Sequence, residues 1–76
     1  MQAGDRVYYL YAGKNGPPIK FAALVLGIED QGVSIRVGRY DVLSKEVETF
    51  ESVVSPTSLQ PRSFPCAYED ELENSA

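Results

Sequence analysis

The sequence predicts an all-β fold: a small five-stranded β-barrel followed by an acidic C-terminal tail. Glycine and proline divide the 76 residues into short segments, and these segments are rich in β-branched and aromatic residues, which favour strands. Residues 33–37 (VSIRV) alternate strictly between apolar and polar side chains, as in a strand with one buried face. A chain this short suits a sheet closed on itself, because closure removes the long unpaired edges.

We expect the first two strands over residues 6–11 and 20–28. The first of them, RVYYLY, is β-branched and aromatic. The second is apolar on both faces, which is typical of a central strand that is covered on both sides. Residues 12–18 between them contain Gly13, Gly16 and a proline pair, so we expect a loop there.

A hairpin turn and a third strand follow. Residues 29–32 (EDQG) have the composition of a tight hairpin turn. The third strand is expected over residues 33–42. Gly38 interrupts it, and we expect either a bulge or a close approach of another part of the chain at that position.

Residues 43–54 (LSKEVETFESVV) fit two structures. Their apolar side chains recur at helical spacing, but Val47 and Val53 also fit a strand with one irregularity. We favour the strand, because pairing Val42 with Val47 leaves a hairpin loop of four residues, 43–46, which is an ordinary length.

This hairpin would bring two arginines close to two glutamates on the outer face of the sheet, where each cross-strand charge pair contributes about 0.2–1 kcal/mol. The residues concerned are Arg36, Arg39, Glu48 and Glu51. We expect Phe50 in the core. Residues 55–59 predict a single 3₁₀ turn, and residues 60–62 predict a short closing strand that Pro61 keeps at an edge.

Residues 63–76 differ from the rest in charge. Residues 1–65 hold seven basic and seven acidic residues, so the four acidic residues of the remaining segment carry the whole net charge of −4. A helix of nine or ten residues would not be stable in isolation. We therefore expect an acidic tail that is flexible unless it docks on the barrel. The side chains available for docking are Phe64, Tyr68 and Leu72.

Composition excludes several classes of site. The chain has no histidine and one cysteine, which excludes imidazole bases, His-bearing zinc sites and internal disulfides. Its longest apolar stretch, residues 21–28, is far shorter than the roughly 20 residues of a membrane span, and no signal peptide is visible. The lone Cys66 suits a reducing cytoplasm. We expect no catalytic residues, no cofactor, no metal ion and a cytoplasmic location.

Four stretches of the chain together resemble the Tudor branch of the SH3-like barrels. They are GDRVYYLY, KFAALVLGI, GVSIRVGRY and EVETFESVVSPTSL. The resemblance covers about residues 4–62 and implies a five-stranded SH3-like barrel. It also implies an aromatic cage that binds methylated lysine or arginine through cation–π contacts. The matching cage positions are Tyr11, Phe21 and Tyr40, whereas Val37 and Val42 stand where an aromatic and a polar amide are expected.

A fainter resemblance is to the plasmid-encoded type II dihydrofolate reductases, SH3-like chains that form a tetramer around one active pore. Their pore strand carries an apolar–Gln–Ile–Tyr run. The corresponding residues here are Val47, Glu48, Thr49 and Phe50. Because the glutamine and the tyrosine are missing, the resemblance does not carry the activity to this chain.

The aromatic residues have two interpretations. Tyr9 and Tyr11 could face the core, or Tyr11, Phe21 and Tyr40 could form a recognition surface with Tyr8 as a fourth member. We hypothesise a non-catalytic module that binds a protein or peptide partner through this surface. One alternative is a self-assembling homo-oligomer whose pocket, either a binding site or an active site, forms only on assembly. Another is a nucleic-acid-associated SH3-like module, which the balanced charge disfavours.

Overall fold

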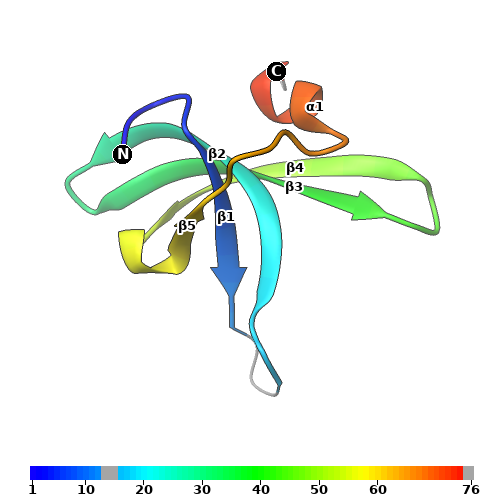
Figure 1. Cartoon of the computed structure of the whole chain (residues 1–76), viewed down its shortest axis with the longest axis horizontal. Helices are drawn as coiled ribbons and strands as arrows, with labels where there is room; N and C mark the ends of the chain where they lie inside the picture. The colour runs from blue at the N-terminus through cyan, green and yellow to red at the C-terminus, as the bar shows by residue number, and fades with distance from the viewer. Residues whose placement is uncertain (13–15, 75–76) are drawn as a thin grey trace.

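The computed structural model describes residues 1–12 and 16–74 and shows an all-β fold with one short helix (Figure 1). A single antiparallel sheet has the strand order β4-β3-β2-β1-β5. Its strands are β1 (Arg6–Tyr11), β2 (Ile19–Glu29), β3 (Gly32–Asp41), β4 (Glu46–Val54) and β5 (Leu59–Pro61), with a 3₁₀ turn η1 (Pro56–Ser58) before β5 and a helix α1 (Glu69–Asn74) at the C-terminus. The all-β prediction is confirmed, and the ambiguous segment after residue 43 is a strand. Of the expected loop at residues 12–18, residues 13–15 lie outside the described residues.

The long strand β2 joins two hairpins that point in different directions. Its first half pairs with β1, from Ile19 opposite Tyr11 to Leu24 opposite Arg6, and its second half pairs with β3 from Ala23 onward. Only the middle of β2 is therefore paired on both sides, and the β1–β2 and β3–β4 hairpins diverge from there (Figure 1). Among the described residues no ladder joins β4 to β5, so the sheet is open rather than closed into the expected ring.

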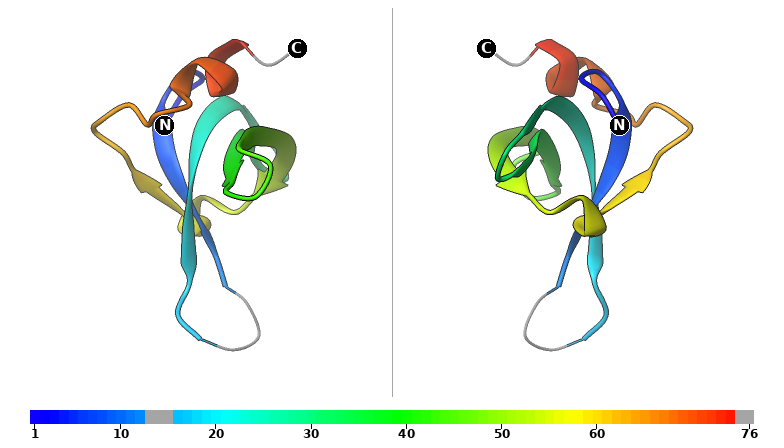
Figure 2. Two further views of the ribbon diagram at one scale, coloured as in Figure 1. Left: turned by 90° about the vertical axis from the view of Figure 1, so that its right-hand side faces the viewer. Right: turned by 90° about the vertical axis from the view of Figure 1, so that its left-hand side faces the viewer.

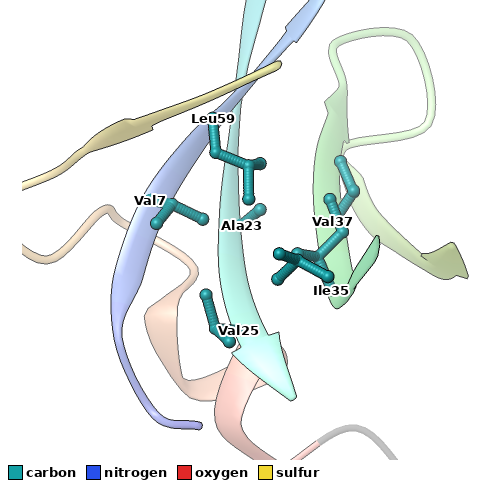
Figure 3. Packing of buried hydrophobic residues seen from close by; sticks show 7 residues of the cluster. Val7, Ala23, Val25, Ile35, Val37 and Leu59 are labelled. Atoms are coloured by element: carbon teal, nitrogen blue, oxygen red, sulfur yellow. The ribbon is translucent and has the colours of Figure 1, made fainter. Parts of the chain in front are cut away.

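The core lies on the inner face of this bent sheet. The alternation of the third strand is confirmed, because Val33, Ile35 and Val37 all point inward and are 2% exposed or less. They pack against apolar side chains of β1, β2 and the start of β5 (Figure 3). These neighbours are Val7, Ala23, Val25 and Leu59.

Two details of the β3–β4 hairpin differ from expectation. Val47 pairs with Tyr40 rather than with Val42, so the loop comprises residues 42–45. Asp41 causes this shift, because its carboxylate accepts hydrogen bonds from the backbone N–H groups of Leu43 (2.9 Å) and Ser44 (3.4 Å) and closes the turn early. The expected charge pairing on the outer face is present for Arg36, which forms an ion pair of 3.3 Å with Glu51. Arg39 lies opposite Glu48 as expected, but the two lie two residues from Val37 and Phe50 respectively and therefore on the inner face, so the expectation that they face outward is wrong.

Phe50 was expected in the core, and that prediction is wrong. Its side chain is 49% exposed. Phe50 lies opposite Val37 and therefore on the inner face, but Val37 is the last residue of β3 that pairs with β2. The inner face continues past this point on β3 and β4, beyond the main cluster of buried core residues.

The C-terminal segment covers the outer face of β2. Both side views place α1 over the arch of that strand (Figure 2). Leu72 is fully buried against Ala22 and Leu24 there, with Tyr68 packed beside it, whereas Phe64 is 81% exposed. At Gly38 we expected either a bulge or a close approach of another part of the chain, and the structure shows the close approach. A Cβ atom at this position would lie only 2.6 Å from the Tyr68 ring. The bulge occurs instead in β2, where the register shifts between Val25 and Gly27.

Candidate functional site

Three aromatic rings form a cluster on the β1–β2 hairpin. Tyr9 lies directly opposite Phe21 in the ladder, and Tyr11 follows Tyr9 on the same face of β1. The Tyr11 ring centroid lies 6.4 Å from that of Tyr9 and 6.5 Å from that of Phe21, with interplanar angles of 63° and 61°. These are edge-to-face contacts, which contribute about 0.5–1.5 kcal/mol each beyond burial. The rings therefore hold one another in a fixed arrangement.

The cluster extends from the core to the surface. Tyr9 and Phe21 are half-buried and pack against the core residues. Tyr11 is 50% exposed, and Ile19, its cross-strand neighbour on the same face, is 55% exposed. We call these four residues, Tyr9, Tyr11, Ile19 and Phe21, the aromatic patch. It is accessible because this part of the hairpin lies beyond Ala23, where the pairing of β2 with β3 ends.

The four residues expected to form the recognition surface do not converge. Tyr11 and Phe21 are in contact, but Tyr8 and Tyr40 lie on the outer face. Tyr8 lies opposite Ala22, and the Lys20 ammonium nitrogen is 5.6 Å from its ring centroid. Tyr40 is 48% exposed and follows Gly38 on the face that α1 covers. Strand periodicity alone separates Tyr8 from Tyr11 and groups Tyr9 with Tyr11, which the recognition hypothesis did not use.

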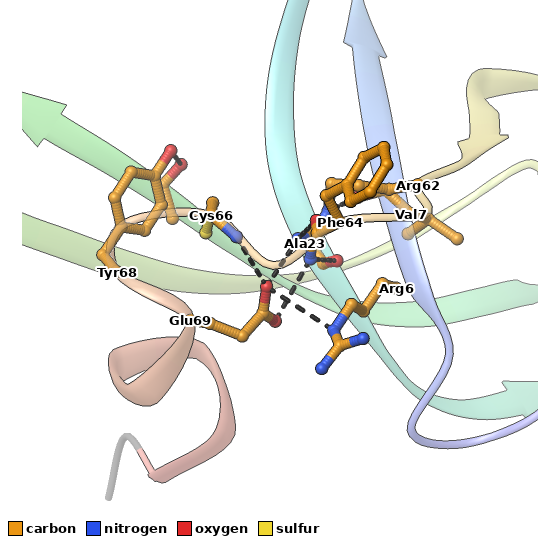
Figure 4. A network of polar contacts seen from close by, with 9 residues as sticks. Arg6, Val7, Ala23, Arg62, Phe64, Cys66, Tyr68 and Glu69 are labelled. Atoms are coloured by element: carbon orange, nitrogen blue, oxygen red, sulfur yellow. Dashed lines mark hydrogen bonds and ion pairs between the residues drawn. The ribbon is translucent and has the colours of Figure 1, made fainter.

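A second group of interacting residues was not predicted at all. Arg62, whose side chain is 1% exposed, lies directly after β5 and forms a bidentate ion pair with Glu69 of α1 (Figure 4). Its remaining N–H groups donate to the backbone carbonyl oxygens of Val7 (3.0 Å), Phe64 (3.1 Å) and Ala23 (2.9 Å). All five guanidinium donors are thus used.

Two titratable groups at the ion pair have shifted pKa values. Hydrogen bonds from Arg62 hold the pKa of Glu69 below its usual value, and the backbone N–H of Cys66 adds a further bond to the carboxylate. Burial raises the pKa of the Cys66 thiol, so the thiol stays protonated and is a weak nucleophile. Among residues 1–12 and 16–74, no group of three His, Cys, Asp or Glu side chains is placed to hold a metal ion.

Comparisons with protein-family models, with curated proteins and with solved structures found no match to this chain. No helix in the described part of the chain is long and apolar enough to cross a membrane.

Proposed function

We propose that this protein is a non-catalytic interaction module that binds a protein or peptide partner through the aromatic patch. The observation that carries the proposal is the position of Tyr11, which is half exposed at the surface end of a cluster whose base is anchored in the core. A ring held in this way loses little conformational freedom when a partner covers it, so most of its burial contributes to affinity. Tyrosine is also among the residues that most often dominate binding energy at interfaces.

The neighbouring residues support a surface that buries apolar area. Ile19 extends the patch beside Tyr11 and is 55% exposed. The Tyr11 hydroxyl can hydrogen-bond to a partner while its ring is covered, a combination typical of interface residues. We propose a partner that presents an apolar or aromatic side chain to this hairpin.

The strand order, together with the 3₁₀ turn between β4 and β5, supports an SH3-like arrangement of Tudor type. We do not extend the proposal to methylated lysine or arginine. A cage requires its aromatic walls to face one point, and Tyr40 lies on the other face of the sheet from Tyr11 and Phe21. The proposed setting is cytoplasmic, which the single cysteine suits.

The test compares two exposed tyrosines. Tagged full-length protein captures partners from cell extract, in unmodified form and as the Tyr11→Ser and Tyr40→Ser variants. Tyr11 and Tyr40 are 50% and 48% exposed, so the two substitutions remove similar exposed rings from opposite faces. We expect proteins captured by the unmodified chain to be lost with Tyr11→Ser and retained with Tyr40→Ser. Equal capture by both variants would contradict the proposal.

A further inference from the structure

The C-terminal segment covers a surface on the outer face of β2 and β3, opposite to the aromatic patch. The floor of this surface is formed by Ala22, Leu24 and Gly38, and guanidinium groups of Arg36 and Arg62 stand at its two ends. We call this surface the outer groove. In the structure, residues 66–74 of the same chain fill it.

At one end, the outer groove binds a carboxylate. The Arg62 guanidinium is held in place by three backbone carbonyl oxygens and directs two further N–H groups at Glu69. The Arg6 side chain, 41% exposed, adds a second positive charge 3.8 Å from the same carboxylate. Two of the three carbonyls, those of Val7 and Ala23, belong to the sheet, so they hold the Arg62 guanidinium in place whichever chain supplies the carboxylate.

The middle of the outer groove binds a leucine and an aromatic ring. Leu72 is 0% exposed between Ala22 and Leu24. The ring of Tyr68 lies against Gly38, where the missing side chain leaves room for both Tyr68 and Leu72. Glu69 and Leu72 are three residues apart, so one helical turn presents both to the groove.

At the other end, Arg36 binds the end of the helical turn. Its Nη1 donates a hydrogen bond of 2.7 Å to the backbone carbonyl oxygen of Leu72, in the last turn of the helix. The same guanidinium forms an ion pair of 3.3 Å with Glu51. The groove therefore recognises a backbone group as well as two side chains.

The charges of groove and segment are complementary. Three arginines surround the groove, Arg6, Arg36 and Arg62, and the segment after residue 65 carries four acidic residues and no basic ones. A segment that enters this groove should accordingly be acidic. Its first anchor must be a carboxylate, because a neutral side chain would leave the buried Arg62 charge unpaired.

The segment is also separable from the sheet. Its helix has six residues, fewer than the 12–15 or so that a helix needs to persist alone in water. None of the strand ladders includes a residue beyond Pro61. The sheet can thus keep its hydrogen bonds while the segment leaves and returns.

We propose that the outer groove is a second binding site, and that it takes an acidic helical turn of a partner protein with a tyrosine and a glutamate followed by a leucine one turn later. The chain's own C-terminal segment is the resident occupant, and a partner segment of the same chemistry displaces it. This site is independent of the aromatic patch, which lies on the other face.

The test uses a fluorescent peptide of residues 63–74 carrying Cys66→Ser, titrated with four forms of the full-length chain: the unmodified chain, Leu72→Asp, and Leu72→Asp combined with either Gly38→Ala or Gly27→Ala. Leu72→Asp places a charge in the apolar part of the groove and should release the resident segment. We expect this form to bind the peptide at least tenfold more tightly than the unmodified chain, in which the tethered segment competes. Adding Gly38→Ala should weaken peptide binding by at least about fivefold, because its Cβ would lie 2.6 Å from the Tyr68 ring. The matched control is Gly27→Ala, where a Cβ meets nothing within 4 Å.

Two measurements keep the proposal falsifiable if the Leu72→Asp chain folds poorly. On unmodified, isotope-labelled chain, millimolar peptide should shift the amide resonance of Gly38, and a peptide with Leu72→Asp should not. Equal effects of the two peptides would overturn the proposal. Sedimentation of the unmodified chain as a dimer that exchanges its segment would also overturn it, because the occupant would then be a second copy rather than a partner. Tyr11→Ser should leave peptide binding unchanged, which separates this site from the aromatic patch.

Discussion

Arg62 and Glu69 form a buried, bidentate ion pair that joins the end of the sheet to the C-terminal helix. The two residues are seven positions apart in the sequence, and the segment between them turns back over the outer face of β2. Side-chain exposures of 1% and 9% place the pair away from solvent. Breaking such a pair is costly because the remaining charge stays buried.

Replacing Arg62 with methionine should destabilise the protein strongly. The substitution removes the guanidinium that pairs with the buried Glu69 carboxylate and its hydrogen bonds to the carbonyl groups of Val7 and Ala23, and we expect a loss of about 3–5 kcal/mol in the free energy of unfolding. Urea denaturation measures it. Lys20→Met is the matched control, because it removes an exposed cation whose described contact is with the Tyr8 ring. A similar small loss for both variants would show that the pair does not hold the segment.

Acid should release the C-terminal segment through Glu69. Because Arg62 lowers the pKa of Glu69 in the folded protein, the stability that the carboxylate contributes is fully present above its unfolded value of about 4.5. That stability is lost as the pH falls through the lower, folded pKa. We expect the Leu72 methyl resonances to move toward random-coil values over this range.

The matched variant for the acid experiment is Glu69→Gln, whose segment should show a much weaker response to acid. Asp41 also has a lowered pKa, from hydrogen bonds donated by the Leu43 and Ser44 backbones, so Asp41→Asn should accompany it. If Asp41→Asn changes the pH midpoint of acid unfolding and Glu69→Gln does not, the acid sensitivity belongs to the β3–β4 turn.

Gly38→Ala should loosen the segment without disrupting the sheet. A Cβ at this position would lie 2.6 Å from the Tyr68 ring and 2.8 Å from Leu72, and overpacking of this kind costs about 1–3 kcal/mol. We expect faster hydrogen exchange in residues 68–72 and an unchanged far-ultraviolet β-sheet spectrum. Gly27→Ala, which meets no atom within 4 Å, should leave exchange in these residues unaltered. Similar exchange rates in the two variants would mean that Gly38 is not required for docking.

The positions of Ile35 and Phe50 predict very different costs of truncation. Ile35 is 0% exposed at the centre of the core, so Ile35→Ala should destabilise by about 2–5 kcal/mol. Phe50 is 49% exposed, and Phe50→Ala should cost about 1 kcal/mol or less. Thermal or chemical denaturation of both variants measures the difference. A larger loss at Phe50 would place that ring in the core after all.

Local patterns were sufficient to predict the strands. Alternation in residues 33–37 correctly predicts the inner face of β3. The middle of β2, which is apolar on both faces, is indeed buried on both: Ala23 and Val25 lie in the main core cluster, and Ala22 and Leu24 lie under Leu72.

Phe50 shows what the alternation of apolar and polar residues cannot predict. The alternation of side chains along β4 correctly places Phe50 on the inner face. It does not reveal that the ladder between β2 and β3 ends at Val37, the residue opposite Phe50.

The contacts of the C-terminal segment could not be predicted in the same way. Tyr68 and Leu72 have helical spacing, which made docking one of two expected outcomes. Helical spacing puts Glu69 rather than Asp70 on the face of Leu72, but it does not reveal that Glu69 is buried against an arginine while Asp70 is exposed. The difference arises from where Arg62 lies after β5, and that position depends on the pairing of β5 with β1.

The central claim is that the aromatic patch binds the partner, and the affinity of a captured partner for three forms of the chain tests it most directly. Isothermal titration gives Kd values for the unmodified protein, for Tyr11→Ser and for Tyr40→Ser. If Tyr11 is a dominant contact worth about 2 kcal/mol, Tyr11→Ser should weaken binding by about 30-fold, and Tyr40→Ser should change it by less than about threefold. Equal Kd values for the two variants, or a larger loss with Tyr40→Ser, would contradict the claim.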